Sequence, residues 1–417
     1  MIDMTRFAGQ KCGTLLNKLL DDSISEHLGI KLVTPLTVVL VFLLLLSVPV
    51  AGYRLLFGIG AASNLNDSWP WGLWIGFDVL GGVAMAAGAF MIAGAVYILN
   101  LKKYKCIARA AILNAFFGYL LAAISITLDV GRSFVIWHPL VMWQVNSVMF
   151  IVALHLVLYL STLATESSPM VLEKIGWERG LNAVHRIMVG AVMFGVALSL
   201  LHQSSLGANY LIVPGKLSPL WYNKQLPYMF LVSALMMGFS MVSFETILTS
   251  KVFKHDVPHD VLVGLSKGIL YTGTFYFFFK MYELLTGPGL ALVFDDNLEG
   301  MMWLIEMAVG VVLPVFLLAL PSVRRDKEKM FAADILVVFG VLFNRLNVSI
   351  FGVARYATRA GGDYFPSIME FTLTIGMIAF AVLGFKLCAK YLPLFPDHQE
   401  SAHPPGTASA AAPRAPE

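Results

Sequence analysis

Ten long apolar segments constrain this 417-residue chain more than any other feature of its sequence. A helix needs about 20 residues to cross about 30 Å of hydrocarbon, because each residue adds 1.5 Å. Lipid offers no hydrogen bonds to an open backbone, so segments of this length indicate helices. The sequence predicts an all-α integral membrane protein with about ten transmembrane helices. We place these helices at about 32–57, 72–98, 106–129, 139–165, 184–204, 228–249, 261–283, 300–320, 330–350 and 366–390.

The composition excludes several other classes of protein. Hydrophobic residues make up 58% of the chain and charged residues 13%, whereas a soluble domain carries roughly a quarter charged residues. The basic residues form no patch interleaved with exposed aromatic rings, so we expect no nucleic-acid partner. Cys12, Cys106 and Cys388 are scattered, so we expect no Fe–S cluster or metal site in this chain.

Three regions follow from these patterns. Residues 1–30 are polar and of mixed charge, without the features of a signal peptide, and form a predicted cytoplasmic N-terminal segment. Residues 31–395 form the transmembrane helical domain. Residues 396–417 are rich in Pro and Ala and form a predicted disordered cytoplasmic tail.

The distribution of basic residues predicts the orientation. Of the 29 Lys and Arg residues, 21 lie on the side that holds both termini and 6 on the other side. Cytoplasmic loops carry an excess of Lys and Arg, so we expect both termini in the cytoplasm of a bacterial inner membrane. Seven of the eight tryptophans lie in the outer half, which indicates either an uneven aromatic belt or an outer surface for docking or ring binding.

Ionisable residues inside the predicted helices fall into two groups. The outer group comprises Asp78, Asp129, Arg132, His202, Lys280, Glu283, Glu306, Arg345 and Glu370, and the deeper or inner group His155, His185, Arg186, Glu245, Lys267 and Asp334. Burying an ionisable side chain in lipid costs free energy, so such residues usually indicate a proton or ion pathway, a binding pocket or an ion pair between helices. One interpretation is a proton route from the cytoplasm to an outer pocket, and the other is pairs that tie helices together, such as Asp129 with Arg132. For haem, only His155 and His185 offer an inner pair of ligands, so we expect none.

Several strings occur in an order that resembles the NrfD/PsrC family. They are Pro70-Trp-Gly-Leu-Trp-Ile-Gly-Phe-Asp78, Ile126-Thr-Leu-Asp129-Val-Gly-Arg132, Val145-Asn146-Ser147-Val148, His202-Gln-Ser-Ser-Leu-Gly207, Gly238-Phe-Ser-Met-Val-Ser-Phe-Glu245 and Tyr364-Phe-Pro366. The resemblance covers about residues 30–395. It is greatest to the HybB-type branch of hydrogenase membrane subunits, and QrcD-like subunits of quinone reductase complexes resemble the chain nearly as well.

The resemblance implies a fold and a function. The fold is two four-helix bundles, formed by helices 2–5 and 6–9, with helices 1 and 10 beside them. A periplasmic ferredoxin-like Fe–S subunit, joined to a catalytic subunit, would exchange electrons with menaquinone or ubiquinone bound near the outer surface. The membrane subunit itself would contain no haem, Fe–S cluster or metal and would be non-catalytic alone.

Carried onto matching positions, the resemblance implies site residues. Those for quinone are Asp78, His202, Gln203 and Ser204, with Asp129, Arg132 and Asn146 near them, and those for proton transfer are Glu245, His155 and His185. Quinone reduction consumes two protons, and buried His or Asp groups can deliver them. Protons drawn through Glu245 from inside would make turnover electrogenic. Two alternatives remain at this point, a secondary transporter and a passive membrane anchor.

Overall fold

A computed structural model of the chain describes residue 18 and residues 29–69, 71–213, 215–253, 257–295 and 297–394. Within these ranges the chain is helical and contains no β-strand, only one isolated bridge between Asn66 and Trp69. Ten helical spans are long and apolar enough to cross a membrane. The predicted all-α multi-pass fold is therefore confirmed, whereas nearly all of the predicted N-terminal segment and the whole tail 396–417 lie outside the described residues.

The ten spans are built from the following elements. The first five are α2 (Pro35–Phe57); η2 (Trp74–Val79) with α4 (Leu80–Met85), α5 (Ala87–Ala93) and η3 (Gly94–Ile98); η4 (Lys102–Tyr104) with α6 (Lys105–Asp129); α7 (Val148–Ile175); and α8 (Glu178–Asn209) with η7 (Tyr210–Ile212). The last five are α9 (Leu226–Phe253); α10 (His259–Thr286); α12 (Leu298–Met307) with η8 (Ala308–Val312) and α13 (Leu313–Ala319); α15 (Lys327–Leu346) with η9 (Asn347–Phe351) and α16 (Gly352–Arg359); and α17 (Ile368–Tyr391). Short helices α3 (Ile59–Ala62), α11 (Gly289–Phe294) and α14 (Pro321–Arg324) lie in connections.

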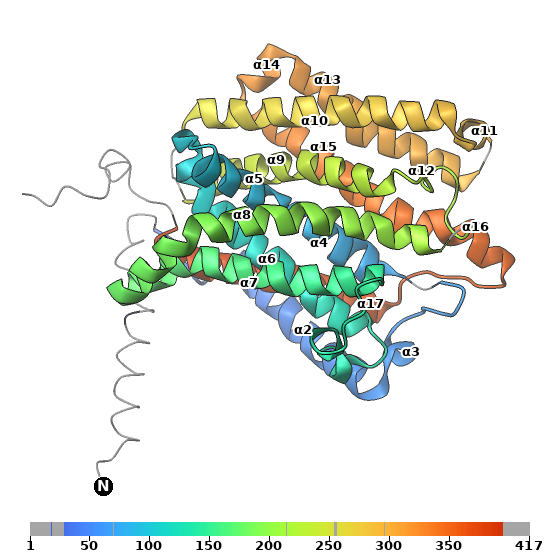
Figure 1. Cartoon of the computed structure of the whole chain (residues 1–417), viewed down its shortest axis with the longest axis horizontal. Helices are drawn as coiled ribbons and strands as arrows, with labels where there is room; N and C mark the ends of the chain where they lie inside the picture. Colours follow the sequence, from blue (N-terminus) through green and yellow to red (C-terminus); the bar gives the residue numbers. More distant parts are fainter. Residues whose placement is uncertain are drawn as a thin grey trace, which may run out of the picture.

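The spans pack as two bundles and a flanking pair (Figure 1). The second to fifth spans form the first bundle, the sixth to ninth form the second, and α9 packs against both α5 and α8 between them. Helices α2 and α17 pack along each other beside α6. We call the end at which α3, α11 and α16 lie the α16 end, and the opposite end the α14 end (Figure 1).

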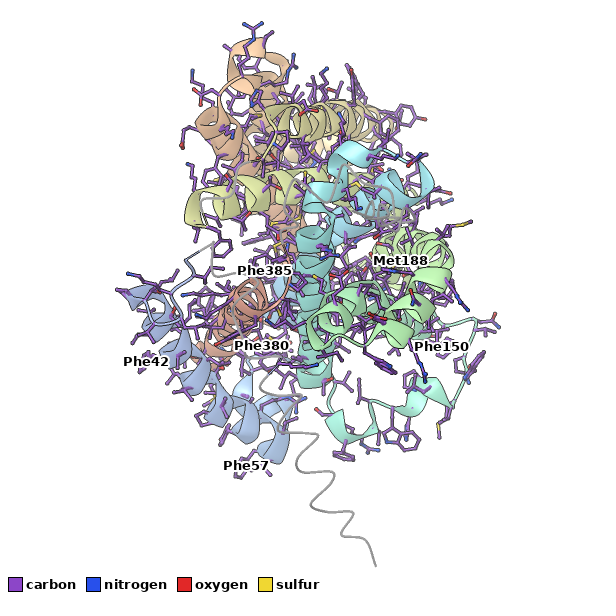
Figure 2. All side chains as sticks on the ribbon, turned by 90° about the vertical axis from the view of Figure 1, so that its left-hand side faces the viewer. Phe42, Phe57, Phe150, Met188, Phe380 and Phe385 are labelled. Carbon is purple, nitrogen blue, oxygen red and sulfur yellow. The ribbon has the colours of Figure 1, made fainter. Side chains whose placement is uncertain are left out.

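Burial separates the central spans from those that face lipid. In the second span 72% of the apolar window is buried, compared with 6% in α2. Figure 2 shows Phe42 and Phe57 of α2 on the outside of the molecule, away from the bundles. An isolated apolar helix surface of this kind is stable only against lipid, so the flanking position of α2 agrees with its composition.

Close glycine contacts fix the spacing between helices. A Cβ atom on Gly88 of α5 would lie 2.9 Å from the carbonyl oxygen of Gly238 on α9, so the two backbones touch. Gly310 of η8 and Gly340 of α15 make an equally close contact in the second bundle. Small residues at such crossings allow helices in lipid to approach closely, because no side chain separates their backbones.

The fourth span differs from its predicted position. The sequence predicts a helix over 139–165, but α7 runs from Val148 to Ile175. Ser147 is its N-cap, since its side chain accepts a hydrogen bond from the backbone N–H of Phe150, and Gly176 ends it with a φ of 71°. Residues 139–147 are apolar enough to resemble a span but form turns, starting with η6 (His138–Leu140).

Candidate functional site

An aromatic and histidine cluster lies in the centre of the first bundle. Tyr119 of α6 contacts Tyr159 of α7 with ring centroids 4.5 Å apart, and contacts His202 of α8 at 5.5 Å. The ring of His155 on α7 lies 6.2 Å from that of His202. Three neighbouring helices thus contribute four titratable rings to one place, which we call the Tyr–His cluster.

The polar atoms of the Tyr–His cluster are buried without partners. In the part of the chain that the structure describes, neither ring nitrogen of His202, nor Nδ1 of His155, nor the hydroxyls of Tyr119 and Tyr159 has a hydrogen-bond partner. The Ser199 hydroxyl lies close to both tyrosine hydroxyls but forms no hydrogen bond of standard geometry with either of them. Buried polar groups are nearly always satisfied, so this concentration indicates a place for waters or a ligand.

The two histidines lie at the same depth. Each is seven residues from the α16 end of its helix, which is about 10 Å by helical rise. Sequence analysis assigned His155 to the inner half beside His185, but the structure places it against His202. His185 is exposed, 17 residues along α8 from His202, and does not belong to the cluster.

Asp78 lies nearer the α16 end, in the π-helical turn η2. It is buried, and Thr374 of α17 donates a hydrogen bond of 2.7 Å to its carboxylate. Gln203 donates to the carbonyl of Val83 at 2.8 Å, while its own side-chain oxygen has no partner among the described residues. Single π-turns are often found at functional sites, where they redirect a side chain.

Asp129 is positioned by a residue that sequence analysis did not single out. Arg54 of α2 donates to the carbonyl oxygens of Leu128 (2.5 Å) and Val130 (2.7 Å), on either side of Asp129. Arg54 is 1% exposed and lies at the last turn of α6. The proposed pairing of Asp129 with Arg132 is therefore replaced by a clamp from the flanking helix.

Three further predicted quinone-site residues lie away from the buried centre. Arg132 and Asn146 are exposed in the turns between α6 and α7. Ser204 is half-buried and donates to the carbonyl of Leu200 within its own helix. The structure thus brings together His202 and His155, with Gln203 next to His202, whereas Asp78 is buried against Thr374 of α17 and Arg132 and Asn146 are exposed.

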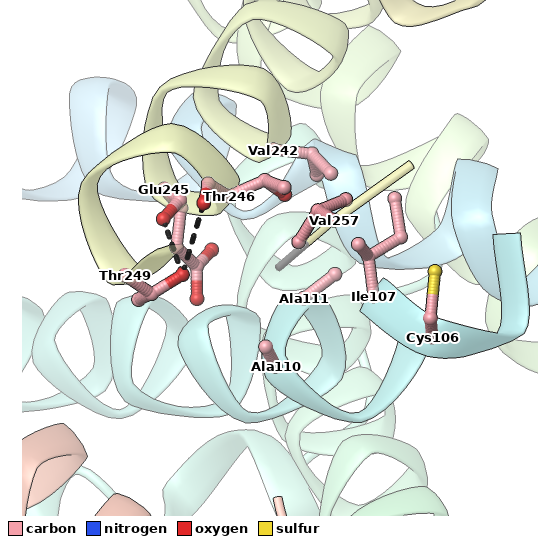
Figure 3. A pocket seen from close by; sticks show the side chains of 9 residues that line it. All are labelled: Cys106, Ile107, Ala110, Ala111, Val242, Glu245, Thr246, Thr249 and Val257. Atoms are coloured by element: carbon pink, nitrogen blue, oxygen red, sulfur yellow. Dashed lines mark hydrogen bonds between the residues drawn. The ribbon is translucent and has the colours of Figure 1, made fainter. Parts of the chain in front are cut away.

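Glu245 lines a separate pocket toward the α14 end (Figure 3). The pocket encloses about 270 Å³ including space open to the outside, and Cys106, Ile107 and Thr249 also contribute to its wall. The Thr249 hydroxyl donates to the backbone carbonyl of Glu245 at 2.7 Å, so it does not occupy the carboxylate. One carboxylate oxygen of Glu245 has no hydrogen-bond partner within the described ranges.

Glu166 is a buried acid that sequence analysis missed. It lies on α7 seven residues beyond Tyr159, and both side chains pack against Gly195 of α8. Residues spaced by seven share a helix face, so His155, Tyr159 and Glu166 could have been grouped from their spacing. The predicted span ended at residue 165, so Glu166 lay outside it and its spacing from His155 and Tyr159 was not considered.

Comparison with known proteins identifies relatives that are named as subunits of a hydrogenase and of a menaquinone reductase. A family model described as "Polysulphide reductase, NrfD" matches residues 61–357. A protein of Escherichia coli K12 named "Probable Ni/Fe-hydrogenase 2 b-type cytochrome subunit" is 31% identical over 84% of this chain and 90% of its own length. A "Menaquinone reductase, integral membrane subunit" of Nitratidesulfovibrio vulgaris is 28% identical over 84% and 89%. Another N. vulgaris protein, without a descriptive name, is 35% identical over 88% and 96%.

The name of the E. coli relative corrects one expectation. A b-type cytochrome is a haem protein, so the expectation that this chain contains no haem is contradicted. Two histidines that could hold such a group are present, because the rings of His155 and His202 lie 6.2 Å apart on neighbouring helices, and both nitrogens of His202 and Nδ1 of His155 have no partner among the described residues. Two histidines on facing helices are the usual axial ligands of haem in a helical bundle.

The family match and the relatives agree with the order of motifs in the sequence. The matched residues include Asp78, Asp129, His202 and Glu245. They extend over nearly all of both bundles and cover well over half of the chain. The chain belongs to the NrfD (polysulphide reductase) family.

Proposed function

We propose that this chain is the quinone-binding membrane subunit of a respiratory oxidoreductase complex. One observation carries the proposal, namely the unpartnered Tyr–His cluster in the centre of the first bundle. Relatives named as subunits of a hydrogenase and of a menaquinone reductase support it, since both names describe membrane subunits of oxidoreductases.

The site has the groups that quinone reduction requires. The reaction adds two electrons and two protons, and each quinone oxygen needs a hydrogen-bond donor that can also transfer a proton. We assign these donor roles to His202 of α8 and Asp78 of η2, and Gln203 is adjacent to His202 in the sequence. Asp129 is the last residue of α6, at the α16 end of the same bundle, and Arg54 donates hydrogen bonds to the backbone carbonyls on either side of it.

Electrons would enter from a partner at the α16 end. The turns between α6 and α7 expose large apolar side chains at this end, including Phe134 (78% exposed), Trp137 and Trp143 (65% exposed). Aromatic residues are enriched in protein interfaces, so this surface suits a periplasmic Fe–S subunit linked to a catalytic subunit. The predicted orientation, with both termini in the cytoplasm of a bacterial inner membrane, places this end in the periplasm.

Protons would reach the site from the α14 end. The Glu245 pocket lies toward that end of the molecule, and Glu166, Tyr159 and Tyr119 lie in the first bundle together with His202. The rings of the Tyr–His cluster have centroids 4.5 to 6.2 Å apart, and we propose that waters connect their polar atoms. Transfer along this line would make quinone reduction electrogenic.

Haem binding is a second candidate function of the same cluster. His155 and His202 would hold the haem, which would supply one-electron transfer. The test is the visible spectrum of the purified complex after reduction with dithionite. A haem at this place gives an α-band that disappears in His155→Ala and remains in His185→Ala, the matched control on the exposed face of α8. An α-band that survives His155→Ala overturns this ligand pair.

The proposal is tested on the complex purified from membranes in mild detergent. We expect a copurifying Fe–S subunit and quinone reduction, and we expect His202→Ala and Asp78→Asn to lower kcat by about a hundredfold, the scale of one lost general acid. Asn146→Ala, on the exposed turn, serves as the control. Normal quinone reduction in both variants, in complexes that retain the partner, would show that the chain only anchors its partner. If the chain purifies alone and takes up a substrate into vesicles, it is a transporter.

A further inference from the structure

Three basic side chains gather on the surface of the second bundle at its α16 end, and the proposed function gives them no role. Arg355 and Arg359 are one helical turn apart on α16, and both are exposed. Lys216, in the connection between η7 and α9, places its ammonium 5.3 Å from the centre of the Tyr356 ring on the same helix. We call Lys216, Arg355 and Arg359 the basic patch.

The basic patch is notable because this side of the protein holds few cations. Only 6 of the 29 Lys and Arg residues lie on the side away from both termini, and the patch contains three of them. Of the other three, Arg54 is buried, whereas Arg132 and Lys224 are exposed in turns. Cations on this side oppose the charge asymmetry that orients a membrane protein, so their concentration in one place indicates a binding role.

The charges of the basic patch are not neutralised within the part of the chain that the structure describes. None of the three cations forms an ion pair there. Glu299, an acid close to the connection that carries Lys216, is buried and accepts a hydrogen bond of 2.7 Å from Ser218. Asp363 is exposed four residues beyond Arg359 but forms no ion pair with it. The patch therefore presents positive charge to whatever binds at this end.

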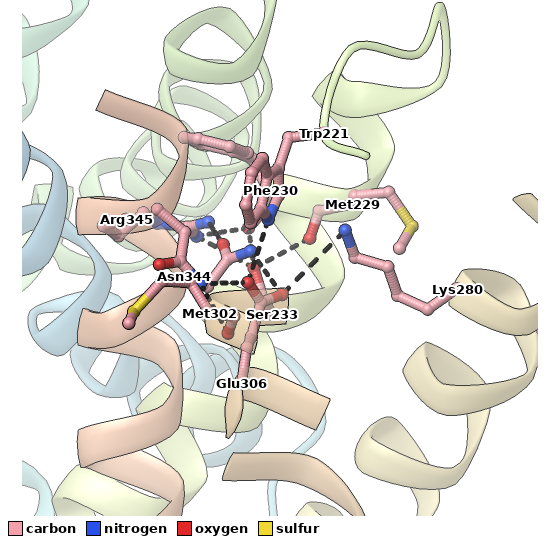
Figure 4. Close-up of polar contacts among 10 residues, drawn as sticks. Trp221, Met229, Phe230, Ser233, Lys280, Met302, Glu306, Asn344 and Arg345 are labelled. Atoms are coloured by element: carbon pink, nitrogen blue, oxygen red, sulfur yellow. Dashed lines mark hydrogen bonds and ion pairs between the residues drawn. The ribbon is translucent and has the colours of Figure 1, made fainter. Parts of the chain in front are cut away.

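Buried contacts hold the connection that carries Lys216 against α16. The backbone N–H of Ser218 donates to the carbonyl of Gly352, the first residue of α16, at 2.7 Å. A Cβ atom on Gly352 would lie 3.1 Å from the ring of Trp221, so the connection and α16 pack closely. Trp221 in turn donates a hydrogen bond of 3.0 Å to the buried carboxylate of Glu306 (Figure 4). The backbone that carries the patch is therefore fixed before a partner binds, which lowers the entropy cost of binding.

We infer that the basic patch is the electrostatic docking site for an acidic surface of the Fe–S partner. This inference rests on the proposed function and adds the charge of the partner's surface and the part of the α16 end that it contacts. Complementary charges mainly raise the association rate and fix the orientation of two proteins. The apolar turns of the first bundle, with Phe134 and Trp137, supply the surface that is buried in the complex. The connection that carries Lys216 follows η7 directly, so a partner on the patch lies next to the end of the span that contains His202.

The test measures how fast the Fe–S partner, released from the purified complex, binds again to the full-length membrane subunit in lipid nanodiscs at increasing NaCl. We expect the association rate to fall as salt rises, because salt screens exposed charges beyond about 10 Å at 0.1 M. Arg355→Glu/Arg359→Glu should associate about tenfold more slowly at low salt and lose most of the salt dependence. Lys102→Glu/Lys105→Glu, the same charge reversal on exposed residues at the α14 end, is the matched control. Arg355→Gln/Arg359→Gln should slow association about threefold, and it keeps the test decisive if the reversal fails to assemble.

Two results would overturn this inference and leave the proposed function standing. The first is a partner that associates equally fast with the unaltered subunit and with the variants of Arg355 and Arg359. The second is a difference between them that occurs in nanodiscs containing phosphatidylglycerol and vanishes in nanodiscs of phosphatidylcholine, which would show that the patch binds anionic lipid headgroups. A complex purified from membranes without any Fe–S subunit is a different outcome, because it overturns the proposed function and this inference together.

Discussion

Arg54 connects the flanking helix to the candidate quinone site. Its guanidinium occupies the last turn of α6, where backbone carbonyls have no partner within the helix, and it donates to two of them on either side of Asp129. A cation at a helix C-terminus is also favoured by the helix dipole. Arg54 therefore fixes the backbone on both sides of Asp129 and is not itself a member of the Tyr–His cluster.

Removal of this clamp should affect turnover more than assembly. Arg54→Met keeps the length of the side chain but releases both carbonyls, so Asp129 loses its fixed position and we expect kcat for quinone reduction to fall about tenfold. Arg132→Met, an identical change on an exposed residue three positions from Asp129, should leave kcat within about twofold. Equal activity of Arg54→Met and Arg132→Met, in complexes of unchanged composition, would refute the positioning role.

Tyr364 joins α17 to the start of the second span, and its titration should be visible in stability. Its hydroxyl donates to Glu370 at 2.6 Å and accepts from the backbone N–H of Leu73 at 2.9 Å. Burial, with the neighbouring Glu370 carboxylate, raises the pKa of Tyr364 above its ordinary value of 10.0. The neutral form is favoured in the folded state, so its stabilising effect is complete below pH 10 and is lost as the pH rises through the raised pKa.

We expect the melting temperature of the complex to fall more steeply above pH 10 than that of Tyr364→Phe. At pH 7 the variant should already be less stable by roughly 1–3 kcal/mol, because Leu73 and Glu370 each lose a partner. Tyr271→Phe, at an exposed position on α10, controls for a general effect of losing a phenol. Parallel pH profiles for the unaltered complex and Tyr364→Phe would show that Tyr364 does not titrate in the way described.

The sequence located buried ionisable residues better than it located their neighbours. Asp78, His202 and Glu245 stand out as ionisable residues in apolar segments, the family resemblance implies their roles, and all three are buried. The contact between His155 and His202 was missed because helix four was expected to begin at residue 139. That start placed His155 about 24 Å deep, whereas the true start at Val148 places it about 10 Å deep. The nine-residue error in the predicted start of α7 thus gave the wrong expected neighbour for His155.

At the scale of elements, hydrophobicity alone located all ten spans. It could not locate the π-turns, because these depend on packing against other helices. Three of the four adjoin or contain buried polar residues, namely η2 with Asp78, η8 after Glu306, and η9 after Arg345. A π-turn shifts the register of a helix by one residue, which allows one helix to bring an apolar face to lipid and a polar side chain to the bundle interior. No periodicity in the sequence predicts where that shift occurs.

The contact between Gly310 and Gly340 gives a test at the same scale. A Cβ atom on either glycine would meet the backbone of the other, which cannot move without separating η8 from α15. We expect Gly340→Ala to destabilise the protein by about 1–3 kcal/mol through overpacking, measured as a lower melting temperature in detergent. Gly190→Ala on α8, where no atom lies within 4 Å of the new Cβ, should be neutral or stabilising by up to about 1 kcal/mol. Equal effects of the two substitutions would contradict the close contact.

At the scale of the whole molecule, two buried acids, Glu245 and Glu166, lie nearer the α14 end than the proposed quinone site does. Glu245 lines the pocket toward the α14 end, and Glu166 lies behind Tyr159 in the same bundle. The proposed electron donor approaches from the opposite end. If protons and electrons reach the quinone from opposite sides, each turnover moves charge across the membrane, and the proton side can be measured directly.

The complex is reconstituted in sealed vesicles with the α16 end outward and a pH dye in the lumen, and electrons are supplied from outside to a lipophilic quinone. We expect the lumen to become alkaline by about two protons per quinone reduced, since both protons come from the α14 end. Glu245→Gln and Glu166→Gln should each slow this uptake about tenfold or more, because an amide cannot relay a proton. Glu173→Gln is the matched control, since Glu173 lies further along α7 in an ion pair with Arg109 and outside the line. A lumen that stays at constant pH during quinone reduction by the unaltered complex would mean that protons enter at the α16 end, and turnover would then be electroneutral despite the buried acids.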